Sequence, residues 1–376
     1  MPAGAPLSAW QRKDAEMTTR YSVACVQTDV WVMDEEQPET RDAVIEKNLK
    51  RNMELVDYLC IEPRYGPKLL VFSEFCLTGV PEGRSLAAYQ DRAVTLPGWV
   101  TEYIGERCRK HGVYVACNTF ERDDDWPGRV FNTSFIVDPD GKVILRYRKN
   151  NDFQTGIPVS TNPGDLYPSY VARYGGQPEA LFPVVDTDIG RLACMTCYDI
   201  RFAEVARCLA LQGAEVIIHP TAEGSGPVAW RQSWDYAKQV RAWENTCYLI
   251  STNNGRTFGS IRPENRQRGL SKIIDYEGRV LAETDGIGET AVTATIDLEL
   301  LRQARTMPFN VIATSRFATY VPIYTKYETW PVDSFDREPL QDRHQSAEIG
   351  RRVLHQMYER GQCIPPERPP ARRGPF

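Results

Sequence analysis

The chain has 376 residues, of which 42% are hydrophobic and 25% charged, so it has enough apolar residues for the core of one large domain or two smaller ones. Its formal net charge of -5 gives no electrostatic reason to expect nucleic acid or an anionic membrane as a partner. No apolar run reaches the roughly 18–20 residues that span a bilayer, and residues 1–20 lack the apolar stretch of a secretory signal, so we expect an N-terminal arm there.

The first half of the chain alternates short apolar runs with amphipathic stretches. Apolar residues three and four positions apart predict helices at 40–60 and 96–111. Continuous apolar runs predict strands at 21–28, 68–73 and 113–119. The runs 130–137 and 142–148 flank the turn sequence Asp138-Pro139-Asp140-Gly141, which predicts a hairpin.

The second half continues the same alternation. A second hairpin is expected at 182–186 and 191–197, followed by a helix at 203–211 and a strand at 215–219. A long helix is expected to bury a face made of Trp230, Trp234, Ala237, Val240 and Trp243. Further strands are expected at 247–252, 270–275, 279–283 and 291–296. This order of elements predicts an α/β protein with mixed sheets.

The chain changes character after residue 301. One late helix is expected, with Ile349, Val353 and Met357 on one face. We expect the rest of this segment to pack on another subunit, because it is rich in aromatic residues such as Phe317, Tyr320, Tyr324 and Tyr327. The last stretch is expected to be irregular because it holds five prolines, at 365, 366, 369, 370 and 375.

Ten cysteines occur in the sequence, several of them inside apolar runs. This placement is typical of buried core thiols in a reducing, cytoplasmic protein. Cys194 and Cys197 form a CxxC pair, but no second ligand pair for zinc exists at short spacing. In a strand, residues three apart point to opposite faces, which also disfavours a redox pair. A non-catalytic CxxC module that binds zinc or cycles redox state remains an alternative.

Cys197 ends an apolar strand and precedes a helix, a position that favours a thiolate nucleophile. A thiol nucleophile needs a base, and histidine is the usual one. Of the four histidines, only His219, at the end of an expected strand, is a candidate for this base. Two other strand ends offer alternatives: Glu74 as a buried carboxylate base, and Lys149 as a cation that stabilises an oxyanion.

Glu74, Lys149 and Cys197 occur in an order and spacing that resemble the nitrilase superfamily of carbon–nitrogen hydrolases. The similar blocks are LLVFSEFCLTG at 69–79, ILRYRKN at 144–150 and GRLACMTCYDIRFAEVAR at 190–207. The resemblance implies a four-layer αββα sandwich over residues 21–300, preceded by the arm of residues 1–20 and followed by a C-terminal extension, residues 301–376. The long helix and the extension look most similar to the aliphatic amidase and formamidase branch.

The same resemblance implies roles for individual residues. Glu74 matches the general base, Lys149 the oxyanion-stabilising lysine and Cys197 the nucleophile, and Tyr198 would supply a backbone N–H to the oxyanion. Many members of the superfamily carry a second glutamate soon after the lysine. Here residues 150–181 contain no glutamate before Glu179, and Asp165 is a possible substitute within a segment expected to be long and irregular.

The implied activity is hydrolysis of a small amide through a cysteine thioester, by a homo-oligomer that needs no metal or organic cofactor. An N-carbamoyl amine is the second candidate substrate. A nitrile is the third, because nitrile-cleaving relatives usually carry a tryptophan where this sequence has Tyr198.

Overall fold

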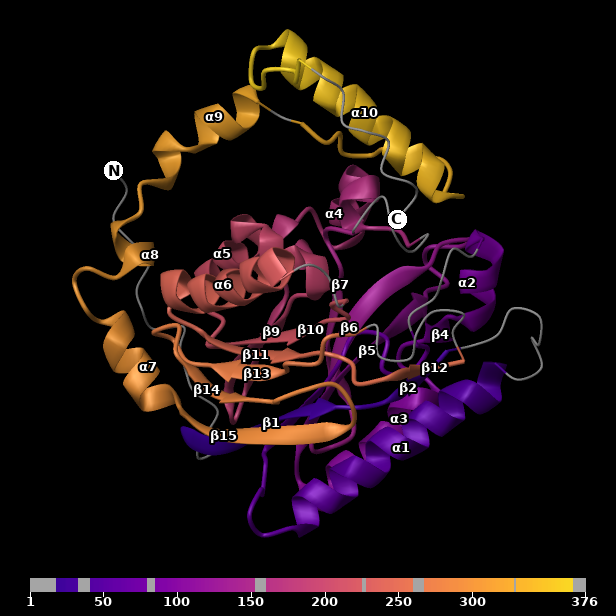
Figure 1. Cartoon of the computed structure of the whole chain (residues 1–376), viewed down its shortest axis with the longest axis vertical. Coiled ribbons are helices and arrows are strands. Elements are labelled where there is room, and N and C mark those ends of the chain that lie inside the picture. The colour runs from indigo at the N-terminus through magenta and orange to yellow at the C-terminus, as the bar shows by residue number, and fades with distance from the viewer. Residues whose placement is uncertain are drawn as a thin grey trace.

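The computed structural model describes residues 18–32, 41–79, 85–152, 160–224, 228–259, 267–327 and 329–367, so most of the expected N-terminal arm and the last three of the five C-terminal prolines lie outside the described residues. Two β-sheets pack face to face with a pair of helices on each outer side, which gives the expected four-layer α/β sandwich (Figure 1). No helix of the described chain is long and apolar enough to cross a membrane.

The first sheet has the strand order β15-β1-β3-β5-β6-β7, and its three central strands, β1, β3 and β5, run parallel. The antiparallel hairpin β6–β7 matches the hairpin expected around Asp138–Gly141. The strands are β1 (Arg20–Gln27), β3 (Leu69–Phe72), β5 (Tyr114–Arg122), β6 (Phe131–Val137), β7 (Val143–Arg148) and β15 (Thr290–Asp297), and the short β4 (Val94–Thr95) pairs with β5.

The second sheet has the order β14-β13-β11-β10-β9-β8, again with three parallel central strands, β9, β10 and β11. Its strands are β8 (Val184–Thr187), β9 (Gly190–Cys194), β10 (Val216–Pro220), β11 (Tyr248–Thr252), β13 (Lys272–Ile274) and β14 (Val280–Glu283). A separate ribbon joins β2 (Val30–Trp31) to β12 (Thr257–Phe258).

Both faces of the first sheet are apolar, and the side chains of successive strand residues point to these two faces in turn. In β3, Leu69 and Val71 belong to the core between the sheets, whereas Leu70 and Phe72 pack toward the outer helices. Those helices are α1 (Arg41–Ile61) and α3 (Trp99–His111). A strand buried on both faces reads as one continuous apolar run, which is why the sequence predicts it well.

Helices α5 (Ala203–Leu211) and α6 (Val228–Asn245) cover the second sheet (Figure 1). The expected apolar face of α6 is confirmed in part: Trp234 and Ala237 pack against the core, but Val240 is 40% exposed and Trp243 is 57% exposed, and the side chain of Trp230 lies outside the described part. Lys238, Ala242 and Asn245 point inward instead. Polar residues occupy this buried face because Lys238 and Asn245 find partners there, which a hydrophobic pattern does not anticipate.

Several elements were not expected from the sequence. The segment 160–181 is not irregular but folds into three short helices, η3 (Pro163–Leu166), α4 (Tyr167–Arg173) and η4 (Pro178–Leu181). Helix α2 (Leu86–Arg92) precedes β4. The C-terminal extension contains α7 (Leu298–Arg305), α8 (Val311–Thr314), η6 (Phe317–Thr319), α9 (Val321–Lys326) and the expected late helix α10 (Arg343–Glu359).

The extension runs up one side of the sandwich and crosses above α4 as α10 (Figure 1). Within this chain, Phe335 and Leu340 pack into a small apolar cluster with Phe75 and Phe120, next to the end of β3. The backbone N–H of Phe335 also donates to the carbonyl of Asp165 at 3.3 Å. Part of the extension is therefore buried against its own chain, close to the strand end that carries Glu74.

Candidate active site

Glu74 and Lys149, which follow the strands β3 and β7, form a buried ion pair. The Lys149 Nζ lies 2.7 Å from Oε1 of Glu74, and the two side chains are 5% and 2% exposed. The amide nitrogen of Asn132 donates to the same carboxylate oxygen at 2.8 Å. Both donors bind Oε1, so they fix the orientation of the Glu74 carboxylate.

Cys197 lies in a strained turn rather than in a strand. Strand β9 ends at Cys194, three residues earlier than expected, and Cys197 opens the short helix η5 (Cys197–Arg201). Its φ of 46° is in the left-handed region, which a residue with a side chain rarely adopts. Cys194 is fully buried in the core between the sheets, while Cys197 is partly exposed. The two cysteines of the CxxC pair thus have different environments.

The charges of Glu74 and Lys149 both act on the thiol of Cys197. Burial raises the pKa of Cys197 to about 12, and the negative charge of Glu74 adds to this rise. Lys149, the backbone N–H of Ala222 and the hydroxyl of Thr221 lower the pKa by smaller amounts. These surroundings favour the thiol over the thiolate, in contrast to the expectation from the turn alone, and call for a base that removes the proton.

Lys149 remains a cation in this environment. Burial lowers its pKa, but the negative charges of Glu74 and Asp152 raise it by more, so that the net result lies above the usual lysine range. A buried ammonium held by carboxylates is a fixed positive charge in a region of low dielectric constant. Such a charge can stabilise an oxyanion strongly.

Asp152 is the second carboxylate at Lys149, and the sequence analysis missed it. Its Oδ1 lies 3.4 Å from Lys149 Nζ, while the other oxygen, Oδ2, accepts hydrogen bonds from Ser160 and from the Asn162 amide. Burial raises its pKa. In the sequence, Asp152 is marked only by its position three residues after Lys149, and it is an aspartate where many members of the superfamily have a glutamate.

Asp165 and Glu179 have other surroundings. The Oδ2 of Asp165 accepts a hydrogen bond from the backbone N–H of Asn162 at 2.9 Å and so caps η3. Burial raises the pKa of Asp165 to about 7. Glu179 is exposed on η4. Among the contacts of the described residues, it is Asp152 rather than either of these that reaches Lys149.

Tyr198 follows Cys197 directly, so its backbone N–H lies in the same turn. Its ring packs against Phe202 and Trp234, with the Arg201 guanidinium 5.3 Å from the ring centroid. These contacts hold the turn in place from its outer side.

Asp199, another residue missed by the sequence analysis, connects the Cys197 turn to the Lys149 loop. It accepts hydrogen bonds from the Tyr147 hydroxyl at 2.7 Å, from the Thr196 N–H at 3.0 Å and from the Asn151 N–H at 2.9 Å. Burial raises the pKa of Asp199 to about 6. This side chain thereby fixes the two loops relative to each other.

A zinc or redox role for the CxxC pair finds no support in its surroundings. All ten cysteines are free thiols. In the part of the chain that the structure describes, no group of three or more His, Cys, Asp or Glu side chains is arranged to hold a metal ion. The donor set for zinc at Cys194 and Cys197 is thus incomplete among these residues.

The structure is similar to solved members of the nitrilase superfamily. Nit3 of Saccharomyces cerevisiae, a member of branch 10 of that superfamily, gives a TM-score of 0.61 at 22% identity, covering 81% of this chain and 99% of that one. An amidase mutant from Nesterenkonia sp. AN1, solved with acrylamide, gives 0.59 at 17% identity, covering 81% and 98%. At these identities the likeness shows the fold.

Sequence comparison gives the family. A formamidase of Bacillus thuringiensis (strain Al Hakam) is 30% identical over 242 residues, which are 64% of this chain and 65% of that protein. The omega-amidase NIT2 of Xenopus tropicalis is 26% identical over 227 residues, 58% of this chain and 73% of that protein. The model of the family described as carbon-nitrogen hydrolase matches residues 22–306, about three quarters of the chain. The protein is therefore a member of the carbon–nitrogen hydrolase family.

Proposed function

We propose that the protein hydrolyses a small linear amide to a carboxylic acid and ammonia or an amine, with Glu74, Lys149 and Cys197 as the catalytic residues. The observation that carries this proposal is the buried 2.7 Å ion pair between Lys149 and Glu74, whose charges both act on the Cys197 thiol. The names of the relatives, formamidase and omega-amidase, support amides as the substrate class.

The proposed reaction is acyl transfer in two halves. Glu74 takes the Cys197 proton as the sulfur attacks the carbonyl carbon, and the oxyanion is stabilised by Lys149 and by the Tyr198 backbone N–H. The C–N bond then breaks, the leaving nitrogen takes the proton from Glu74, and a thioester remains. In the second half, Glu74 removes a proton from water, the hydroxide attacks the thioester, and the thiolate leaves as it regains the proton.

Asp152 is the residue we propose for the second carboxylate role, in place of Asp165. Its buried Oδ1 lies 3.4 Å from Lys149 Nζ, and no group among the described residues donates a hydrogen bond to it with good geometry. A buried acceptor without a donor is costly unless a ligand supplies one. An amide substrate has N–H groups that satisfy such an oxygen, whereas a nitrile has none. Asp152 therefore favours amides and carbamoyl amines over nitriles.

Ammonia release from purified protein tests this proposal. A panel of short aliphatic amides, N-carbamoyl amines and nitriles is incubated with the wild-type protein and with Cys197→Ala. Release from an amide by the wild type alone supports the proposal. Release only from carbamoyl amines or nitriles would select one of the alternative substrates.

We also propose that the protein is a homo-oligomer that acts in the cytoplasm, since ten free thiols suit a reducing compartment. Two regions of a single chain expose large apolar side chains. The first is the outer side of α6, where Tyr236, Val240 and Trp243 are 63%, 40% and 57% exposed. The second is α9, where Ile323 and Tyr324 are 58% and 61% exposed. Such surfaces are typical of subunit interfaces.

A further inference from the structure

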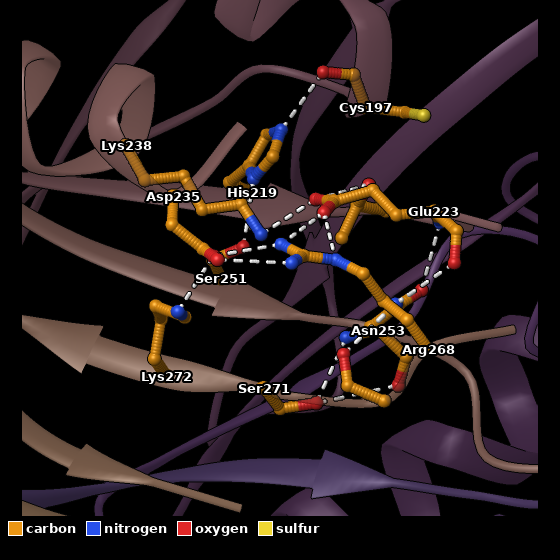
Figure 2. Close-up of polar contacts among 12 residues, drawn as sticks. Cys197, His219, Glu223, Asp235, Lys238, Ser251, Asn253, Arg268, Ser271 and Lys272 are labelled. Carbon is orange, nitrogen blue, oxygen red and sulfur yellow. Dashed lines mark hydrogen bonds and ion pairs between the residues drawn. The ribbon is translucent and has the colours of Figure 1, made fainter. Parts of the chain in front are cut away.

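His219 is the only histidine whose contacts, among the described residues, reach the turn of Cys197, yet the contact is not with the thiol. Its Nε2 lies 3.0 Å from the carbonyl oxygen of Cys197, and its Nδ1 lies 2.9 Å from the hydroxyl oxygen of Ser251 on β11. Figure 2 shows the Cys197 sulfur pointing away from the imidazole ring. The ring therefore acts on the backbone of the nucleophile rather than on its sulfur.

The carbonyl group fixes the tautomer of this histidine. A carbonyl oxygen has no hydrogen, so Nε2 must carry the proton and donate it to Cys197. In a neutral ring, Nδ1 is then an acceptor, and the Ser251 hydroxyl donates to it. One proton on Nε2 satisfies both contacts, so the ring needs no positive charge.

The surroundings of His219 favour the neutral ring. Burial, with smaller effects from the cations Lys238 and Lys149, lowers the pKa of His219 to about 3 against the opposing effects of the Cys197 carbonyl and Glu223. Because the imidazole cannot take a proton near neutral pH, it cannot serve as the base for Cys197.

Lys238 belongs to a buried network that holds its charge beside the histidine (Figure 2). Its Nζ lies 2.5 Å from Oε1 of Glu223, whose other oxygen accepts from Arg268 Nε at 2.6 Å. Arg268 also pairs with Asp235, which pairs in turn with Lys272 at 2.7 Å. The pKa of Glu223 falls to about 2, because Lys238 and Arg268 outweigh the effect of burial. Burial lowers the pKa of Lys238, and the charge of Glu223 opposes this effect.

We propose that His219 is a positioning residue that holds Cys197 in its left-handed backbone conformation through the Nε2–H hydrogen bond, and that the Ser251 hydroxyl holds the imidazole in this one tautomer. The φ of 46° at Cys197 is unfavourable for a residue with a side chain and persists only where the surroundings enforce it. A buried hydrogen bond to the carbonyl of that same residue is such a restraint. The role of His219 rests on the proposed catalytic function of Cys197.

Two substitutions at His219 separate positioning from general packing. His219→Gln keeps an amide N–H that can reach the Cys197 carbonyl, while His219→Phe keeps the ring volume but leaves that carbonyl without a donor. We expect kcat of His219→Phe to fall by about ten- to a hundredfold with little change in KM, in line with the loss of one buried hydrogen-bond donor. His219→Gln should stay within about threefold of the wild type. His355→Gln, at a 74% exposed side chain, is the matched control and should leave kcat unchanged.

A second measurement does not depend on knowing the substrate. The rate of Cys197 alkylation by iodoacetamide, followed on its own peptide by mass spectrometry, gives the pH midpoint of the thiol. Since a neutral imidazole contributes no charge, the midpoint should be the same in the wild type and in His219→Gln. An upward move of a full pH unit or more in His219→Gln would show that the ring acts as a base or as a charged partner, and would overturn the proposal.

The ring itself is observed by nitrogen-15 NMR of histidine-labelled protein, which distinguishes the two neutral tautomers from the imidazolium. The proposal predicts a neutral Nε2–H ring for His219 from pH 5 to 8. Titration in this range, or the Nδ1–H tautomer, would contradict it, and so would wild-type kcat in His219→Phe. This measurement uses the wild-type chain, so it decides the question even where His219→Phe does not fold. If no amide is hydrolysed, the proposed function fails while the NMR result still stands for His219.

Discussion

Lys149 contacts Glu74 and Asp152 at once, with its Nζ 2.7 Å from the first carboxylate and 3.4 Å from the second. One buried cation between two acidic groups balances only part of their charge. This arrangement leaves one carboxylate able to take up a proton at little electrostatic cost when the thiol is deprotonated. We propose that the positive charge of Lys149 also stabilises the oxyanion that forms on the substrate of Cys197.

The ion pair gives the first prediction. Lys149→Ala should lower kcat by on the order of 10²–10³ or more, which is the scale of a lost oxyanion donor. Lys149→Arg should recover little, because a planar guanidinium does not fit the contacts of a compact ammonium. Glu74→Gln should cause a comparable loss, since it removes the base and keeps the shape. In the double variant the losses should not add, because both groups serve one transition state. Steady-state kinetics on one amide measures all four variants, and kcat near the wild-type value in either single variant would contradict the assigned roles.

Asp152 and Asp165 give a matched pair for the second prediction. Asp152→Asn should lower kcat by at least tenfold, because it replaces an acceptor beside Lys149 with a group that also donates. Asp165→Asn should have a much smaller effect on kcat, since Asp165 caps η3 through the Asn162 N–H. Kinetics of both variants, with thermal unfolding as a check on folding, makes the comparison. A larger loss of kcat from Asp165→Asn than from Asp152→Asn would reverse the assignment.

Asp199 gives the third prediction, on stability. Its pKa in the folded protein is raised to about 6, above the value of about 4 for an unfolded chain. For a raised pKa, the stabilisation is fully present below pH 4 and is lost as the pH rises through 6. Relative to Asp199→Asn, the wild type should therefore lose about 2 kcal/mol of unfolding free energy between pH 4 and pH 6. Urea unfolding of both proteins at several pH values measures the difference, and a constant difference would show that the pKa of Asp199 is not raised.

The exposed apolar surfaces give the fourth prediction. Light scattering of the full chain should give a multiple of the monomer mass of 42.8 kDa, because α6 and α9 expose Trp243, Ile323 and Tyr324. Trp243→Glu should shift the protein toward the monomer, since a charge in an apolar interface is costly. Leu281→Glu, at a 42% exposed leucine on β14, serves as the control and should not change the mass. A monodisperse monomer at full length would refute the interface.

The sequence predicted the strands well because strands buried on both faces, such as Leu69–Phe72, form unbroken apolar runs. It failed where tertiary contacts decide the outcome. The buried side of α6 is partly polar because Lys238 pairs with Glu223, a residue that a helix pattern cannot supply. Asp152 and Asp199 stand three residues after Lys149 and two after Cys197, but such spacing does not reveal their contacts. The hydrogen bonds that Asp199 accepts from Tyr147 and Asn151, and the contacts of His219 with Cys197 and Ser251, join segments that only folding brings together.

A comparison of Cys197 with Cys194 is the most direct test of the proposal that Cys197 is the nucleophile. Ammonia release from an amide hydrolysed by the wild type is measured for Cys197→Ala and for Cys194→Ala, with thermal unfolding as a control for folding. We expect no detectable turnover by folded Cys197→Ala. Cys194→Ala should keep substantial turnover, because Cys194 is buried in the core between the sheets. Turnover by Cys197→Ala at a rate close to the wild type, or equal loss from both substitutions, would contradict the account.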